Sequence, residues 1–278
     1  MNRLCQAVGV GRAGYYRFRL RRQTQAGDMD LRSKLQSLAL QWPAYGYRRV
    51  HQELIRQGWG VNHKRVLRLM RMDNLLCLRR RKFIFTTDSK HGLHIYPNLA
   101  KDMVLTDINQ LWVADITYIR LEVEFVYLAV VLDAFSRSCI GWALQRSLEA
   151  ALVLEALHMA LKKRHPRPGL VHHSDRGVQY ASKDYTDELN EHGIRISMSR
   201  RGNVFDNAMA ESFIKTLKYE EVYRMEYRDL AQAKVSIKEF LEKIYNQKRL
   251  HSALGYRPPR EFERSLSLAS RRATGAAA

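Results

Sequence analysis

The sequence is poor in cysteine and has no long apolar run. Its 278 residues include only three cysteines, Cys5, Cys77 and Cys139, which lie far apart. This spacing excludes a disulfide framework and a paired-cysteine metal site. No apolar run approaches the roughly 18 residues that a membrane span needs, and the N-terminus lacks a secretory signal of useful length. With 46% apolar residues the chain can bury a core, so we expect a globular cytoplasmic protein.

Acidic residues are also scarce, above all in the first third of the chain. The 28 Asp and Glu face 47 Lys and Arg, which gives a formal net charge of +19. Residues 1–84 contain 19 Lys and Arg against 4 Asp and Glu, a balance of +15, whereas residues 85–278 have a balance of only +4. Because a basic surface gains affinity for phosphates by counterion release, we predict that residues 1–84 bind a polyanion. A basic segment that is merely soluble is the alternative.

Residues 1–84 are predicted to be helical, with a helix-turn-helix at about residues 45–75. Apolar residues recur at helical spacing before and after the break Gly58-Trp59-Gly60, and Asn62 is a candidate N-cap for the second helix. That helix would display four cations where a recognition helix meets DNA, namely Lys64, Arg65, Arg68 and Arg71. An ordinary helical hairpin shows the same pattern, so DNA binding and a purely structural role both remain open here.

A short basic run follows the helix-turn-helix. It consists of Arg79, Arg80, Arg81 and Lys82. Such a run is usually a solvated stretch, but beside a helix-turn-helix it is expected to hold backbone phosphates. Residues 85–100 are rich in polar residues and are predicted to be an exposed linker.

Residues 101–262 are predicted to form one α/β domain, and residues 263–278 a disordered tail. Runs of β-branched and aromatic residues predict strands at 111–119, 125–132, 138–144, 170–173 and 194–198. Helical patterns lie at 148–164, with Ser147 as candidate N-cap, at 180–192 and at 207–219. A three-strand meander followed by alternating helices and strands is the order of an RNase H-like domain with a mixed five-stranded sheet.

Three carboxylates in this domain have largely uncharged neighbours. Asp115 lies inside the first strand, Asp175 ends the short strand at 170–173, and Glu211 lies inside the last helix. Burial raises the pKa of such groups, so each needs compensation, and for Asp115 alone a buried salt bridge is the simpler explanation. Together, three carboxylates can hold two hard divalent cations, which serve phosphodiester cleavage.

Other polar residues near these three are expected to have supporting roles. Asp133 precedes a turn, where a structural bond or salt bridge is favoured over metal binding. Asp206 is expected to cap or precede the last helix. His172 and His173 lack a histidine or cysteine pair at zinc spacing, and His173 is expected to orient the site.

The motifs now described resemble the DDE transposases of the bacterial insertion-sequence group that builds its transposase from two overlapping reading frames. These enzymes are relatives of retroviral integrases. The matching stretches are Tyr45-Gly46-Tyr47-Arg48-Arg49, residues 111–118, residues 127–137, His173-Ser174-Asp175-Arg176-Gly177, residues 197–211, Tyr245-Asn246, Arg249, His251, Leu254-Gly255 and Pro258-Pro259. The 35 residues between Asp175 and Glu211 match the spacing that names the D,D(35)E class.

The resemblance implies a chemistry and a set of residues for it. Asp115, Asp175 and Glu211 would be catalytic and bind two Mg²⁺ or Mn²⁺ ions, with no structural zinc. Lys218 would contact terminal DNA, and Lys215 lies on the same helical face.

The resemblance also implies an activity and partners. The chain would be the downstream-frame product and would perform strand cleavage and 3′-hydroxyl strand transfer at insertion-sequence ends. It would bind double-stranded DNA as a homo-multimer in the cytoplasm, at the nucleoid, with the upstream-frame product or a fusion as a further partner. The alternatives are a nuclease on the same fold and a non-catalytic DNA-binding regulator of a longer transposase.

Overall fold

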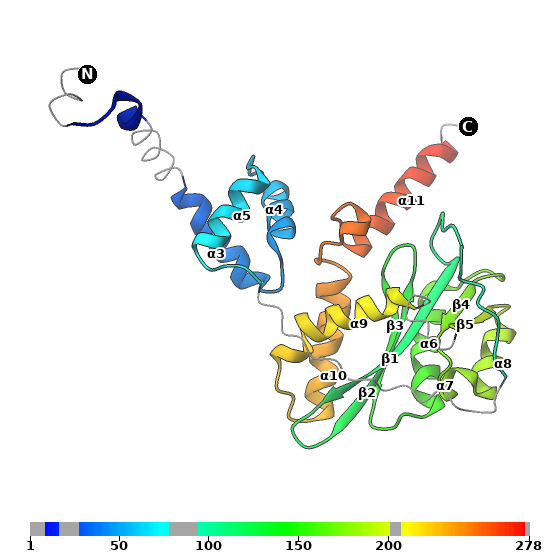
Figure 1. Cartoon of the computed structure of the whole chain (residues 1–278). Helices are drawn as coiled ribbons and strands as arrows, with labels where there is room; N and C mark the ends of the chain where they lie inside the picture. The colour runs from blue at the N-terminus through cyan, green and yellow to red at the C-terminus, as the bar shows by residue number, and fades with distance from the viewer. Residues whose placement is uncertain (1–8, 17–27, 78–93, 201–206, 276–278) are drawn as a thin grey trace. The chain divides into compact units, whose positions relative to one another are not determined.

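The structure is a computed structural model that describes residues 9–16, 28–77, 94–200 and 207–275. The chain divides into two compact units, residues 1–82 and residues 83–278 (Figure 1). In the described parts, no helix combines the length and apolar character needed to cross a membrane.

Within residues 28–77 of the N-terminal unit lie the helices α3 (Met29–Gln41), α4 (Tyr47–Arg56) and α5 (His63–Met72). Its core consists of one apolar face from each helix: Leu31, Leu35, Leu38, Val50, Leu54, Val66, Leu69 and Met70. Leu40, which shares the apolar spacing of α3, is 82% exposed. The predicted helix-turn-helix therefore corresponds to α4 and α5 packed on α3.

Local chemistry explains the turn between α4 and α5. Gly58 has φ of +84°, a conformation that glycine adopts without steric cost, and it ends the run of α4. Asn62 then caps α5, because its side-chain oxygen accepts a hydrogen bond from the Lys64 backbone N–H at 2.8 Å. The predicted N-cap is confirmed.

The second unit is built on a five-stranded sheet in the order β3-β2-β1-β4-β5. Its strands are β1 (Leu111–Arg120), β2 (Phe125–Asp133), β3 (Cys139–Gln145), β4 (Val171–Ser174) and β5 (Arg195–Met198). The first three strands form an antiparallel meander, whereas β4 runs parallel to both β1 and β5. This is the predicted mixed sheet of an RNase H-like domain.

Helices cover both faces of this sheet (Figure 1). One face packs on α6 (Ala150–Arg164), α7 (Val178–Ala181) and α8 (Lys183–Glu191). The other face packs on α9 (Ala208–Glu220), α10 (Leu230–Glu239) and the π-helical turn η2 (Phe240–Tyr245). Trp112 and Ala114 belong to the first layer, and Val113 belongs to the second. Since strand side chains alternate, Asp115 points to the face covered by α9.

Two of the predicted helices differ in detail from those observed. Ser147 does not cap α6, which begins after Glu149 without a side-chain cap bond. The helix predicted at 180–192 is divided into α7 and α8 by Ser182, whose φ of −64° and ψ of 147° are extended. Tyr180 of α7 and Tyr185 of α8 are both buried, so both helices turn an apolar side toward the core.

The structure differs from the disordered tail predicted at 263–278. Helix α11 (Pro259–Gly275) continues through it, and residues 276–278 lie outside the described range. Two contacts hold the first turns of this helix: Arg164 forms an ion pair with Glu263, and Arg257, just before the helix, donates to the Ser265 hydroxyl at 2.9 Å.

Candidate active site

One predicted carboxylate lies on β1, and a second directly follows the neighbouring parallel strand β4. The β1–β4 register pairs Val113 with His173, and Asp115 lies two residues further along β1. The charge of Asp175 acts on the pKa of Asp115, so the two carboxylates are close. Strand β4 ends at Ser174, whereas β1 continues to Arg120. Asp115 is therefore placed where its parallel neighbour ends, the position from which open α/β sheets usually present functional groups.

A short turn holds Asp175 immediately after β4. The Gly177 backbone N–H donates to Asp175 Oδ1 at 2.9 Å. A Cβ atom on residue 177 would lie 3.0 Å from the same oxygen, closer than nearly all real Cβ contacts. Glycine at this position therefore leaves the Asp175 carboxylate room beside the chain.

Glu211 lies in the first turn of α9, and Asn207 fixes the start of this helix against β1. The Asn207 side-chain Nδ2 donates to the carbonyl oxygen of Ala114 at 3.1 Å, and its backbone oxygen accepts from the Glu211 N–H at 3.1 Å. The Glu211 side chain itself is exposed. The preceding residues, including the predicted cap Asp206, lie outside the described range.

Electrostatics connects these acids with Lys218. Burial raises the pKa of Asp115 to about 8, and the charge of Asp175 and, more weakly, that of Glu211 act in the same direction. The Ile116 N–H, which donates to Asp115 Oδ1 at 2.9 Å, and Lys218 oppose the shift. Partial burial also raises the pKa of Glu211. Burial lowers the pKa of Lys218, and the charge of Asp115 opposes this shift. The site is short of positive charge.

The three carboxylates do not form a closed metal cage in the observed side-chain positions. Within the described ranges, no three His, Cys, Asp or Glu side chains are grouped closely enough to hold a metal ion. Asp115 and Asp175 come from β1 and from the residue after β4, whereas Glu211 reaches the site from a separate helix.

The two predicted DNA-contacting lysines of α9 differ in environment. Lys218 is partly buried, and its Nζ lies 4.3 Å from the centroid of the Tyr118 ring, a cation–π distance. Lys215 is exposed. The structure therefore places Lys218, but not Lys215, in the electrostatic environment of Asp115.

His173 contacts the neighbouring strand through both ring nitrogens. Its Nδ1 lies 2.8 Å from Ser197 Oγ, and its Nε2 lies 3.0 Å from Ser199 Oγ. Ser199 Oγ also donates to the Ser174 carbonyl at 3.2 Å. With both nitrogens engaged, His173 is suited to fix β4 and β5 just before Asp175 rather than to bind a metal.

His172 points into the opposite layer and has a structural role. Its Nε2 lies 3.0 Å from the Tyr185 hydroxyl, and burial lowers its pKa to about 3. The ordinary value is about 6.5, so between these values the unfolded chain binds a proton that the folded chain does not. His172 therefore destabilises the fold as pH falls below about 6.5.

A change of His172 to Gln should flatten this acid dependence. In the native protein the free energy of unfolding should fall by up to about 1.4 kcal/mol per pH unit on account of this one group. Urea unfolding at pH 7.5 and at pH 5.0 gives the difference in the free energy of unfolding between the two pH values. This difference should be smaller in His172→Gln than in the native protein. The exposed His192→Gln is the control and should keep the native slope; equal slopes in all three proteins would contradict the assignment.

Asp133 confirms the expected turn role. It is fully buried, and its carboxylate accepts bonds from the backbone N–H groups of Asn109 at 2.7 Å, Ser136 at 2.8 Å and Phe135 at 3.1 Å. Burial raises its pKa, and these bonds oppose the rise. Asp133 thus closes the turn after β2.

Asn246 of the C-terminal motif closes the edge strand β3. Its Oδ1 accepts from the Cys139 N–H at 2.9 Å, and its Nδ2 donates to the Cys139 carbonyl at 2.8 Å. The side-chain amide thereby takes the place of a neighbouring strand at an exposed edge.

Two of the four cations predicted on the recognition helix, Arg65 and Arg68, bind Asp28, which no pattern in the sequence indicated. Arg65 Nε donates to Asp28 Oδ1 at 2.8 Å, and Arg68 Nη2 donates to Asp28 Oδ2 at 3.1 Å. Asp28 is 5% exposed, so its bonds to the two arginines hold the start of α3 to α5.

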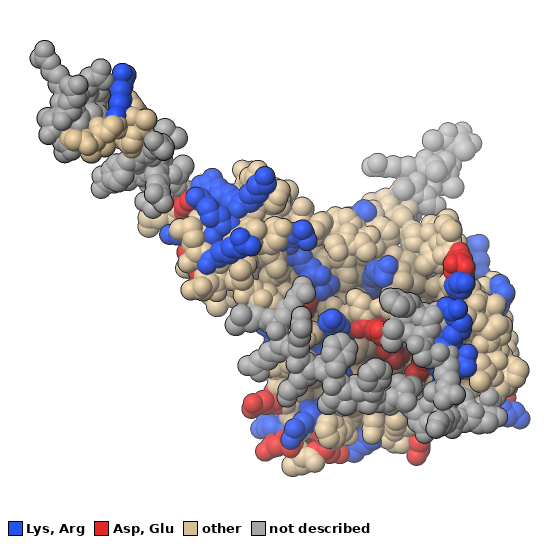
Figure 2. All heavy atoms as spheres, viewed as in Figure 1, with Lys and Arg blue, Asp and Glu red and all other residues tan. Residues whose placement is uncertain are grey.

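The other two predicted cations, Lys64 and Arg71, are exposed, and Figure 2 shows Lys and Arg side chains gathered on this unit. The run Arg79, Arg80, Arg81 and Lys82 lies outside the described residues.

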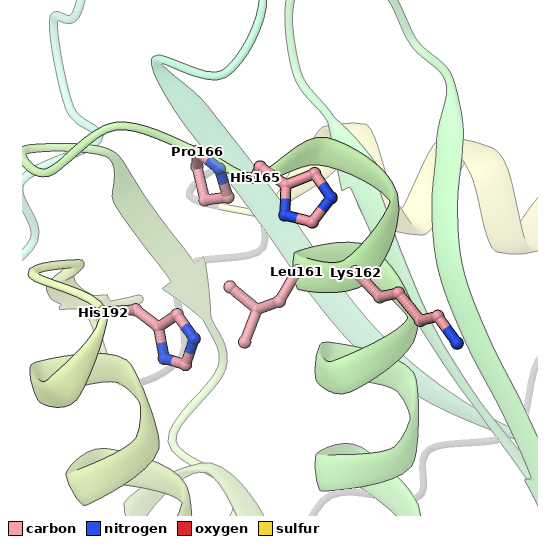
Figure 3. A pocket seen from close by; sticks show the side chains of 5 residues that line it. All are labelled: Leu161, Lys162, His165, Pro166 and His192. Carbon is pink, nitrogen blue, oxygen red and sulfur yellow. The ribbon is translucent and has the colours of Figure 1, made fainter.

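A separate hollow lies at the end of α6 (Figure 3). It is lined by Leu161, Lys162, His165, Pro166 and His192. None of these residues was predicted to act in the site, and none belongs to the carboxylate group.

Comparison with known proteins identifies both units. Two integrase core domain families match residues 106–204 and 192–259, and an HTH-like domain family matches residues 28–83. The chain is similar to the "Insertion element IS600 uncharacterized 31 kDa protein" of Shigella sonnei, with 38% identity over 263 residues that cover 93% of this chain and 97% of that protein. It is also similar to the "Transposase InsF for insertion sequence IS3A" of Escherichia coli (strain K12), with 35% identity, covering 94% and 92% respectively.

A solved structure of the HTLV-2 integrase catalytic core domain in complex with magnesium is also similar. It has 17% identity and a TM-score of 0.44, and the match covers 56% of this chain and 96% of that chain.

The fold and the family matches define an integrase core domain preceded by an HTH-like domain. At 35–38% identity over more than nine tenths of its length, the chain belongs to the insertion-sequence transposases.

Proposed function

We propose that this chain performs metal-dependent strand cleavage and 3′-hydroxyl strand transfer at the ends of an insertion sequence. The observation that supports this most directly is the proximity of Asp115 on β1 to Asp175 just after the parallel strand β4, where burial and, next, the charge of Asp175 raise the pKa of Asp115 to about 8. The charges of Asp175 and Glu211 both raise the pKa of Asp115, and the charge of Lys218 lowers it. These charges support an excess of negative charge at the site.

This surplus fits a divalent cation. Asp115, Asp175 and Glu211 provide only oxygen ligands, which Mg²⁺ and Mn²⁺ prefer. We propose that these three side chains hold two such ions, with Glu211 turning toward the two aspartates from α9. When bound, the ions would activate a hydroxyl group and stabilise the leaving oxygen of the phosphodiester.

The remaining parts of the chain would bind and orient DNA. The Lys218 ammonium, partly buried near Asp115, would contact a phosphate next to the scissile bond. The basic N-terminal unit would hold double-stranded DNA through α5, with Lys64 and Arg71 among its contacts and Arg65 and Arg68 shared with Asp28. Work on two ends implies a homo-multimer at the nucleoid, and an upstream-frame product or fusion is a further proposed partner.

A joining assay with the native chain tests this function. A labelled duplex containing an end of the element, incubated with target DNA and Mg²⁺, should yield both cut strands and products covalently joined to the target. A nuclease on the same fold would give cut strands only. A non-catalytic regulator would retard the DNA without any metal-dependent product, and either result would contradict the proposal.

A further inference from the structure

A group of aromatic side chains lies on the surface beside the carboxylates. We call Tyr118, Phe125, Tyr219 and Tyr223 the aromatic patch. Phe125 is 52% exposed and Tyr223 is 46% exposed, although both are large and apolar. Tyr118 and Phe125 meet edge to face at 5.7 Å between ring centroids, and Tyr219 meets Tyr223 in the same way at 5.7 Å. Tyr118 and Tyr219 both act on the pKa of Tyr223, which is raised chiefly by burial, so the two pairs are neighbours.

The aromatic patch is continuous with the candidate active site. Tyr118 follows Asp115 by three residues in β1, and Tyr219 follows Lys218 directly in α9. The Lys218 ammonium connects the two, because it lies over the Tyr118 ring and also interacts electrostatically with Asp115. Lys218 therefore links a ligand on the patch to the candidate active site.

The charged groups around the patch favour an anionic ligand. The acids Glu220 and Glu221 next to it are bound to Arg249 and to Tyr227 respectively. Arg224 is exposed beside the rings, and its Nε donates to the Tyr219 carbonyl at 3.1 Å. Two further cations, Arg120 and Lys215, are exposed, and Arg120 is the cross-strand partner of Phe125. The exposed acids nearby in the sequence are Glu122 and Glu226.

Flat apolar rings interleaved with cations suit a single-stranded nucleic acid. Aromatic side chains stack on the faces of unpaired bases, and neighbouring cations hold the phosphates between them. A duplex cannot use such a surface in the same way, because its base faces are covered by stacking. An isolated pair of exposed rings would be unremarkable, but here the rings adjoin a site that acts on phosphodiesters.

We propose that the aromatic patch binds unpaired DNA bases next to the reacting phosphate. This inference rests on the proposed function, because it assumes that the carboxylates act on DNA. It adds a binding site for a frayed or single-stranded DNA end, with Phe125 and Tyr223 as the stacking surfaces and Lys218 at the phosphate between that end and the carboxylates.

The test compares DNA ends in binding experiments without divalent metal. Fluorescence anisotropy of the full chain is measured with three probes: a flush duplex, the same duplex with three unpaired nucleotides, and that overhang made abasic. The native chain should bind the base-containing overhang about 5- to 100-fold more tightly than the abasic one. Phe125→Ser combined with Tyr223→Ser should lose this preference and keep its affinity for the flush duplex.

A matched control uses exposed apolar residues that are not aromatic. Val123, two residues before Phe125 in the sequence, is 87% exposed, and Met225, two residues after Tyr223, is 42% exposed. Val123→Ser with Met225→Ser should keep the native preference.

Several outcomes would overturn the proposal. They are the absence of any preference in the native chain, an equal loss of affinity for all three probes in the aromatic variant, and a change of oligomeric mass in that variant on sedimentation. The last result would make the patch an interface with a second copy of the chain. Because the measurement needs no catalysis, its result is independent of whether strand transfer is observed.

Discussion

Replacement of Asp115 or Asp175 by Asn, or of Glu211 by Gln, is expected to reduce strand cleavage and joining by at least about 1,000-fold. Each change removes one of the proposed anionic oxygen ligands while preserving the size of the side chain. Metal ions contribute several kcal/mol of transition-state stabilisation to phosphoryl transfer, and each 1.4 kcal/mol corresponds to a factor of ten in rate. The measurement is the rate of cut and joined product with saturating Mg²⁺.

These variants should lose activity without losing the fold. The raised pKa of Asp115 shows that its charged form is disfavoured by burial and by Asp175, so Asp115→Asn relieves a conflict rather than creating one. Its thermal midpoint should equal or exceed the native value, and its DNA affinity without metal should be unchanged. Asp187→Asn, on the exposed side of α8, is the control and should keep full activity. Native-like joining by any of the three variants would remove that residue from the proposed site.

The sheet was largely predictable because each strand has a clear apolar run. The observed limits of β1 and β2 lie within one residue of the predicted ones. The sequence could predict only that Asp115 and Asp175 lie on or next to strands of the same sheet. The β1–β4 register that brings these strands together is a long-range property of the fold, and no local pattern in the sequence determines it.

The least predictable features depend on contacts between distant residues. Helix α11 extends into a segment rich in Ala and Ser, and its Glu263 pairs with Arg164, about a hundred residues earlier. Arg65, a predicted DNA-contacting residue, also binds Asp28 at the start of α3. Neither acid is close in sequence to its partner, so periodicity and spacing gave no signal for these pairs.

Asn207 shows a related limit at the site itself. Its sequence position before α9 suggested an ordinary helix start, and its side chain instead donates to the Ala114 carbonyl on β1. Its Oδ1 is buried and has no hydrogen-bond partner among the described residues. A motif can indicate that Glu211 belongs with Asp115, but the bond that holds its helix beside that strand is visible only in the structure.

The far end of α9 has a second anchor in Arg249. Its guanidinium binds the Glu220 carboxylate with two parallel bonds, Nε to Oε2 at 2.8 Å and Nη2 to Oε1 at 2.7 Å. The side chains are only 4% and 10% exposed. Arg249 also lies over the Tyr245 ring at 5.8 Å and beside His251. The pair therefore connects α9 to the C-terminal motif through a desolvated, bidentate contact.

Arg249→Ala is expected to lower the free energy of unfolding of the catalytic unit by about 3–5 kcal/mol, because it removes both bonds of a buried ion pair from the Glu220 carboxylate. Urea-dependent hydrogen exchange in β1 and α9 measures this loss. Arg249→Lys should restore little of it, since an ammonium cannot form both bonds. Arg249→Met combined with Glu220→Met should restore much of it, because no charge is then buried alone.

The exposed pair of Arg146 and Glu124 provides the control for this prediction. Its side chains are 61% and 34% exposed, and Arg146→Ala should cost less than about 1 kcal/mol. Equal costs for Arg249→Ala and Arg146→Ala would show that the buried pair does not hold α9. If the larger cost is observed, Arg249→Ala should also weaken strand transfer under conditions where the protein remains folded. Glu211 and Lys218 both project from α9, and with only the Asn207 anchor left their positions beside Asp115 would no longer be fixed from both ends.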